Sequence, residues 1–158
     1  MEIYFEDHDG ENMKRILIMG VGAQGSTIAK RLNEERNVSE IICADYDLKA
    51  AAAVGDSLSK GKTIQLDARE FRHVVEAAKG VDIIVNGLPI EFNLIIMEAA
   101  LEVGAAYLDL CMTEIPRKTA EESTRYLFSI HDDKFKGKEL LALTNTGSAP
   151  GLANVIAR

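Results

Sequence analysis

The chain has 158 residues, about the size of one domain, and 47% of them are hydrophobic, which is enough for a substantial core. The net charge of −7 argues against nucleic acid as the main partner, and no apolar run approaches the roughly 20 residues that span a membrane. The amino terminus is acidic and lacks the basic and long apolar regions of a signal peptide. Cys43 and Cys111 have no C-x-x-C spacing, and the three His residues do not cluster. We therefore expect a cytoplasmic protein with reduced thiols and no metal site.

Short apolar runs alternate with helix-like stretches along nearly the whole chain. The apolar runs predict strands at 15–19, 40–44, 63–66, 81–86, 106–110 and 140–144. Helices are expected at 23–36, 48–59, 70–78, 92–103 and 118–133. Continuous apolar strands suit a parallel sheet that is buried on both faces. The alternation therefore predicts an α/β fold with a doubly wound parallel sheet of the Rossmann type, in the strand order 3-2-1-4-5-6.

The most informative motif is a glycine-rich turn between the first predicted strand and the first predicted helix. It has the G-x-G-x-x-G spacing, with Gly20 for the tight turn, Gly22 for close approach of a pyrophosphate, and Gly25 for close packing of helix on strand. Ala23 and Gln24 open the helix, whose free N–H groups and positive dipole end favour phosphate. The order of strand, glycines, helix, strand and acid predicts a dinucleotide-binding site.

Three residues after the second and third predicted strands are candidates for the adenosine half of the ligand. Asp45 can accept hydrogen bonds from the ribose hydroxyls and would repel a 2′-phosphate, which favours NAD over NADP. Tyr46 could pack beside the adenine or be an exposed turn residue. Asp67 could reach the adenine amino group, or it could serve the turn and cap at its own position. Asp47 is better explained as a helix cap.

Candidates for the nicotinamide half follow the later strands. The loop Gly87-Leu88-Pro89 lies beside the expected switch point of the sheet, with Gly87 for close backbone approach and Pro89 to stiffen the turn. Cys111 could line the nicotinamide pocket or be a small apolar residue, and the sequence supplies no base to make it a nucleophile. The segment around Gly147 could face the cofactor, and we also interpret it as a hinge.

These motifs resemble the amino-terminal NAD(P)-binding domain of the saccharopine dehydrogenase family, including its lysine 6-dehydrogenase-like members, over residues 14–158. The resemblance is carried by the segments 20–25, 44–47, 65–67, 86–93, 104–109 and 146–154. It adds Asn86 to the cofactor-binding candidates. Ile90 stands where some members that make saccharopine carry a Tyr after the loop proline, which favours the lysine 6-dehydrogenase or carboxynorspermidine dehydrogenase branches.

The resemblance implies a nicotinamide-dependent enzyme that transfers hydride at a C–N bond of an amino acid or polyamine. It also implies a domain organisation: residues 1–13 form a polar tail or an extra edge strand, 14–150 the Rossmann domain, and 151–158 the start of a helix into a separate substrate domain. We expect this chain to be inactive without that domain, and an exposed domain interface to favour homodimers. The alternatives are a stand-alone NAD(H)-sensing module and, more weakly, an NADP- or SAM-binding variant.

Overall fold

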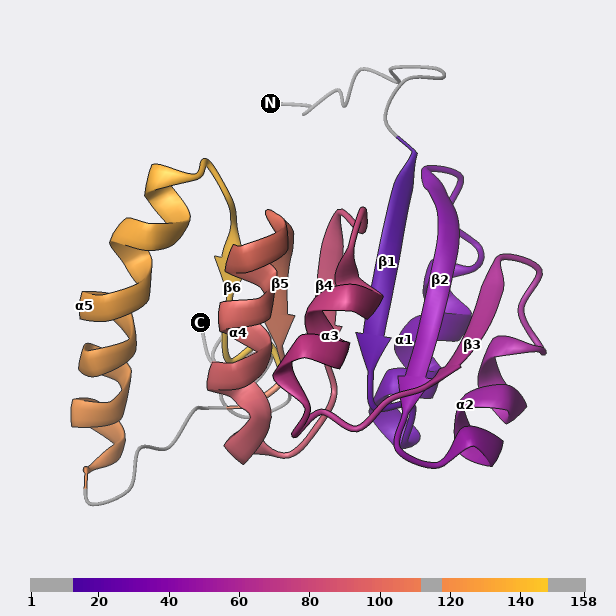
Figure 1. Ribbon diagram of the computed structural model, residues 1–158, viewed down its shortest axis with the longest axis horizontal. Coiled ribbons are helices and arrows are strands. Elements are labelled where there is room, and N and C mark those ends of the chain that lie inside the picture. Colours follow the sequence, from indigo (N-terminus) through magenta and orange to yellow (C-terminus); the bar gives the residue numbers. More distant parts are fainter. Residues whose placement is uncertain (1–12, 112–117, 148–158) are drawn as a thin grey trace, which may run out of the picture.

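The computed structural model describes residues 13–111 and 118–147, and the terminal segments on which we predicted a tail and a linker lie outside them, apart from Met13. Six parallel strands form one sheet in the order β3-β2-β1-β4-β5-β6, which confirms the predicted fold (Figure 1). The strands are β1 (Lys14–Met19), β2 (Val38–Asp45), β3 (Gly61–Gln65), β4 (Ile83–Asn86), β5 (Ala106–Asp109) and β6 (Ala142–Leu143). The helices are α1 (Ala23–Leu32), α2 (Leu48–Gly55), α3 (Phe71–Ala78), α4 (Asn93–Val103) and α5 (Ala120–Gly137), with a 3₁₀ turn η1 (Ile90–Phe92) before α4.

Helices cover both faces of the sheet, and the central strand β1 contributes to both. Leu17 and Met19 pack in a core with residues of α3 and α4, whereas Ile16 and Ile18 pack in a second core with residues of α1 and α2. In Figure 1, α3 and α4 lie in front of the sheet and α1 lies behind it. Burial on two faces explains why the strands are continuous apolar runs rather than alternating ones.

Two helices end earlier than predicted. α1 stops at Leu32 instead of residue 36, and the side-chain oxygen of the following Asn33 accepts a hydrogen bond from Lys60 N at 3.1 Å. α2 stops at Gly55 instead of residue 59, although Asp47 caps its start as predicted by accepting from Lys49 N at 2.8 Å. Local sequence pattern does not reveal such contacts between distant residues.

The carboxyl-terminal elements also differ from their predicted bounds. α5 begins with a capping box between Thr119 and Glu122 and continues to Gly137, past the predicted end at residue 133. β6 contains only Ala142 and Leu143 instead of residues 140–144, and these two residues pair with Tyr107 and Leu108 of β5. No described helix is both long and apolar enough to cross a membrane.

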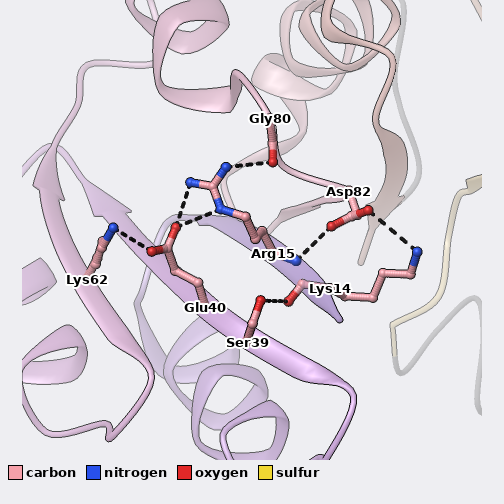
Figure 2. Close-up of polar contacts among 7 residues, drawn as sticks. All are labelled: Lys14, Arg15, Ser39, Glu40, Lys62, Gly80 and Asp82. Atoms are coloured by element: carbon pink, nitrogen blue, oxygen red, sulfur yellow. Dashed lines mark hydrogen bonds and ion pairs between the residues drawn. The ribbon is translucent and has the colours of Figure 1, made fainter. Parts of the chain in front are cut away.

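A charged cluster joins the strands toward the amino-terminal edge of the sheet. Figure 2 shows Glu40 of β2 accepting from Arg15 Nη2 of β1 at 2.7 Å and from Lys62 Nζ of β3 at 2.5 Å. The Arg15 guanidinium also donates to the Gly80 carbonyl at 2.7 Å, and the Arg15 backbone N–H donates to Asp82 at 2.8 Å. The Lys62 hydrogen bond, followed by the Arg15 contacts, lowers the pKa of Glu40 despite its partial burial. These charges satisfy one another across three strands, so we interpret the cluster as structural.

Candidate dinucleotide-binding site

The glycine-rich loop leaves β1 with the backbone geometry that the motif predicts. Gly20 has φ +82°, a left-handed conformation, and its N–H donates to the Ala44 carbonyl of β2 at 2.8 Å. A Cβ atom on Gly25 would collide with the Gly20 carbonyl oxygen, so only glycine lets α1 start this close to the strand. A Cβ on Gly22 would meet nothing within 4 Å. The loop thus has one glycine for the turn, one for packing, and one that borders open space.

The amino terminus of α1 offers backbone donors beside that open space. Gly22 is its N-cap and no side chain caps the helix; the first backbone bond runs from Ser26 N to Gly22 O at 2.9 Å. The N–H groups of Ala23, Gln24 and Gly25 precede this bond and have no acceptor within the helix, as in any first helical turn. Free donors at a helix amino terminus, next to a glycine without a side chain, suit a pyrophosphate.

Asp45 ends β2 beside the same loop and is hydrogen-bonded to it. One carboxylate oxygen accepts from Val21 N at 3.0 Å and the other accepts from Asp47 N at 3.0 Å. No ion pair to Asp45 occurs among residues 13–111 and 118–147. A carboxylate without a cationic partner retains acceptor capacity for hydroxyl groups and repels phosphate.

A cavity of about 450 Å³ opens beyond the carboxyl ends of β1, β2 and β3. It brings together five of the predicted residues: Gly20, Asp45, Tyr46, Asp67 and Leu88. Residues that the sequence did not single out complete its lining: Met19, Ala44, Leu66, Ala68, Arg69 and Phe92. In such sheets, ligands bind at the carboxyl ends of the strands, and the size and the mixed polar and apolar lining of this cavity suit a nucleoside.

Arg69 is the main side chain of the cavity that sequence reasoning missed. Its guanidinium donates to both carboxylate oxygens of Asp67, with Nη2 2.5 Å from Oδ2 and Nε 2.9 Å from Oδ1. Its Cζ atom also lies 5.8 Å from the centroid of the Tyr46 ring. The side-chain hydrogen bond from Arg69 holds the pKa of Asp67 at about 2. The only signal in the sequence was an arginine two residues after the acid that follows β3.

The loop after β4 is held by a buried polar network at the ends of β4 and β5. Asn86, 1% exposed, donates to Asn93 Oδ1 at 2.8 Å and accepts from Leu88 N at 3.1 Å. The Tyr107 hydroxyl accepts from Asn86 at 3.3 Å and donates to Asp109 at 3.0 Å. Burial raises the pKa of Asp109 and, more strongly, that of Tyr107. The Asn86 side chain therefore holds the β4 loop through its bond from Leu88 N. Its contact with a cofactor stays a prediction.

Gly87 also has a packing role in this loop. Its N–H donates to the Met19 carbonyl at 2.8 Å, and a Cβ atom on it would lie 2.9 Å from the Gly20 carbonyl oxygen. The absent side chain thus allows the β4 loop to lie against the glycine-rich loop. Pro89 follows as the residue before η1.

Cys111 and Gly147 lie together near the end of β5, away from the 450 Å³ cavity. The Cys111 carbonyl accepts from Asn93 Nδ2 at 3.0 Å, and burial, followed by the charge of Asp109, raises the pKa of its thiol. A protonated thiol suits the apolar role better than a nucleophilic one. A Cβ atom on Gly147 would collide with the Leu110 carbonyl oxygen, so the segment after β6 packs directly on the chain leaving β5.

The fold, the glycine-rich loop and the cavity at the sheet edge define a nicotinamide dinucleotide-binding domain of the Rossmann type. The family model described as the saccharopine dehydrogenase NADP binding domain matches residues 16–139, and the chain belongs to this family.

Known relatives agree with this assignment. The chain is 31% identical over 153 residues to carboxyaminopropylagmatine dehydrogenase from Synechocystis sp., an alignment that covers 90% of the chain and 36% of the relative. It also resembles the structure of saccharopine dehydrogenase (L-Glu forming) from Saccharomyces cerevisiae, with a TM-score of 0.73 and 17% identity over 91% of the chain and 29% of that protein. A triphenylmethane reductase from Citrobacter sp. in complex with NADP(H) has a TM-score of 0.59 and 16% identity, covering 82% and 48% of the two chains.

The family description and the Synechocystis relative both name a dehydrogenase, and neither supports the sensing module. The chain spans about a third of the length of the first two. The likeness to the solved structures, at 16–17% identity, establishes the fold alone.

Proposed function

We propose that the chain is the NAD(H)-binding domain of a dehydrogenase that acts at a C–N bond of an amino acid or polyamine. The observation that carries the cofactor assignment is Asp45, whose carboxylate lies beside the glycine-rich loop and lines the adenosine-sized cavity without a cationic partner among the described residues. Such a carboxylate can bind the two ribose hydroxyls and repels a 2′-phosphate. NADP is the less favoured ligand, even though the family description names it.

The residues that would hold the dinucleotide divide by position along the sheet edge. The first N–H groups of α1 and the side-chain-free Gly22 would bind the pyrophosphate, while Asp45 and Tyr46 would contact the adenosine. The β4 loop, and Cys111 beyond it, would border the nicotinamide. The bound cofactor supplies the hydride chemistry, and the protein positions it.

The substrate class rests on the family and on the Synechocystis relative, whose name gives carboxyaminopropylagmatine as its substrate. We propose that the groups that bind the substrate correspond to the part of that relative, about two thirds of its length, that the alignment does not cover. No Lys or His is among the described residues that line the adenosine cavity, and we assign no catalytic acid or base.

The cofactor assignment is tested by titrating the chain with NADH and NADPH in a calorimeter. We expect NADH to bind more tightly, and Asp45→Asn to weaken NADH binding by about tenfold, because a hydrogen bond to a charged acceptor contributes about 1.5 kcal/mol. Asparagine has one acceptor oxygen, so it can keep the bond from Val21 N of the glycine-rich loop but not also the bond from Asp47 N. Asp56→Asn is the matched control, because Asp56 bonds Thr63 Oγ1 at 2.6 Å outside the cavity. Tighter binding of NADPH by the unaltered chain would overturn the assignment.

A further inference from the structure

The lining of the adenosine cavity contains one basic side chain among the described residues, and that side chain is already neutralised. Arg69 lies at the mouth of the cavity with 68% of its side chain exposed, and its partner Asp67 is 27% exposed. An arginine near this position of a Rossmann fold can accommodate the 2′-phosphate of NADP. Whether Arg69 does so depends on how firmly Asp67 engages it.

The geometry of the pair occupies most of the acceptor capacity of Asp67. Oδ1 accepts from the Arg69 backbone N at 3.0 Å, Oδ2 accepts from Nη2 at 2.5 Å, and the single Nε–H is shared between Oδ1 at 2.9 Å and Oδ2 at 3.1 Å. Three N–H groups thus occupy a carboxylate that has about four acceptor positions. With Arg69 in place, Asp67 has little capacity left for the adenine amino group that we predicted it to bond.

The main chain and one further contact restrain the guanidinium. The backbone bond from Arg69 N to Asp67 closes a turn over two residues, so the main chain itself directs the arginine back to its partner. The guanidinium also lies near the Tyr46 ring, whose loop is held by a hydrogen bond from Gln65 Nε2 to the Tyr46 carbonyl at 3.0 Å. Arg69 is therefore held between an acid and an aromatic ring.

We propose that Asp67 determines cofactor selectivity by withholding Arg69 from the 2′-phosphate of NADP. With the pair intact, the arginine charge is cancelled and the unpaired carboxylate of Asp45 dominates the electrostatics of the cavity, which disfavours the phosphate. Without the Asp67 charge, Arg69 becomes a free cation at the cavity mouth. The inference rests on the proposed dinucleotide function and assigns selectivity to a residue pair outside the β2 loop.

The test measures the ratio of Kd for NADPH to Kd for NADH in the 158-residue chain. We expect Asp67→Asn to lower this ratio about 3- to 10-fold, since an exposed guanidinium gains only a modest attraction to the phosphate and the repulsion from Asp67 is lost as well. Asparagine forms the same turn, so the fold should be unchanged by circular dichroism and thermal unfolding. The change in ratio should shrink at high salt, because the cation is exposed.

Two controls separate the release of Arg69 from a simple change in charge. Glu70→Gln removes one negative charge from the same exposed loop but leaves the Asp67–Arg69 pair intact, and the double variant Asp67→Asn/Arg69→Ala has no cation to release. We expect both to stay within twofold of the unaltered ratio. An unchanged ratio in Asp67→Asn, or an equal fall in either control, would overturn the inference while leaving dinucleotide binding in place. Failure of the unaltered chain to bind either nucleotide would overturn the proposed function and this inference together.

Discussion

The glycines of the α1 loop have different roles, as the motif predicts. Gly20 supplies a positive φ angle, a side chain on Gly25 would collide with the Gly20 carbonyl, and Gly22 faces open space. The first two therefore serve the fold of the protein, and we propose that the third serves the ligand. This division makes stability and binding separable by substitution.

We expect Gly25→Ala to destabilise the chain by about 1–3 kcal/mol, because the new methyl group must displace backbone rather than a flexible side chain. Gly22→Ala is the matched variant: its φ of −61° suits alanine and its Cβ meets nothing, so stability should change by no more than about 0.5 kcal/mol. Nucleotide affinity should nevertheless fall in Gly22→Ala. Urea unfolding and calorimetric titration of both variants give the comparison. Equal losses of stability would contradict the division of roles.

At the scale of elements, polar groups at the two edges of the sheet have different functions. The Arg15–Glu40–Lys62 cluster joins β1, β2 and β3 toward the amino-terminal edge (Figure 2). At the carboxyl edge, Asn86, Tyr107 and Asp109 are buried and hold the ends of β4 and β5 and the start of the segment after β6, since Asp109 accepts from Asn145 N at 2.7 Å. One network fixes strand pairing, and the other fixes the loops that would border the nicotinamide.

The charged cluster predicts an acid-dependent contribution to stability. The folded-state pKa of Glu40 is lowered, so its contribution is present above the ordinary glutamate value of 4.5 and is lost as the pH falls through the folded value. We expect Glu40→Gln to cost about 1 kcal/mol at neutral pH, because Arg15 and Lys62 remain partly exposed to water. The difference from the unaltered chain should disappear in acid.

Urea unfolding from neutral pH down to about pH 3 measures this dependence. Glu34→Gln provides the control, because its pair with Arg31 is 65% exposed on the Glu34 side and should contribute little. A cost for Glu40→Gln that is the same at every pH would show that hydrogen bonding, rather than the charge of Glu40, carries the effect.

At the scale of the whole molecule, the described residues form a cofactor-binding module with its site along one edge of the sheet. The module spans 36% of its Synechocystis relative. Homodimer formation and the position of a substrate domain remain predictions. The described residues at this edge can support binding of the nucleotide. Turnover of an amine substrate is a separate function, for which we assign no residues among them.

We therefore expect this chain to bind NADH but to show no measurable dehydrogenase activity with amino acids or polyamines. NADH formation, followed by absorbance with lysine, saccharopine and carboxyaminopropylagmatine as substrates, checks the second part. Calorimetric titration of the same sample verifies that the nucleotide site is intact. Measurable oxidation of any of these substrates would place the substrate-binding groups within these 158 residues and contradict the proposal.

The sequence alone predicted the strand order, the glycine-rich turn and the acid after β2. These features depend on local apolar runs and on backbone conformations that only certain residues adopt, so short stretches of sequence contain the information. The ends of α1, α2 and β6 were predicted less well. α1 ends beside the contact between Asn33 and Lys60, and β6 is limited to the two residues that pair with β5, which local sequence does not reveal.

Only the tertiary structure decided what each acid at the sheet edge is free to do. Asp45 ends β2 and Asp67 follows β3, yet Asp45 accepts a hydrogen bond from the glycine-rich loop and has no cationic partner among the described residues, whereas Asp67 is paired with Arg69. The sequence could not separate them, because hydrogen-bond partners depend on which loops the parallel sheet brings together and on side-chain conformation. The same reason explains why Asn86 is buried beneath the β4 loop while Arg69 lies at the mouth of the cavity.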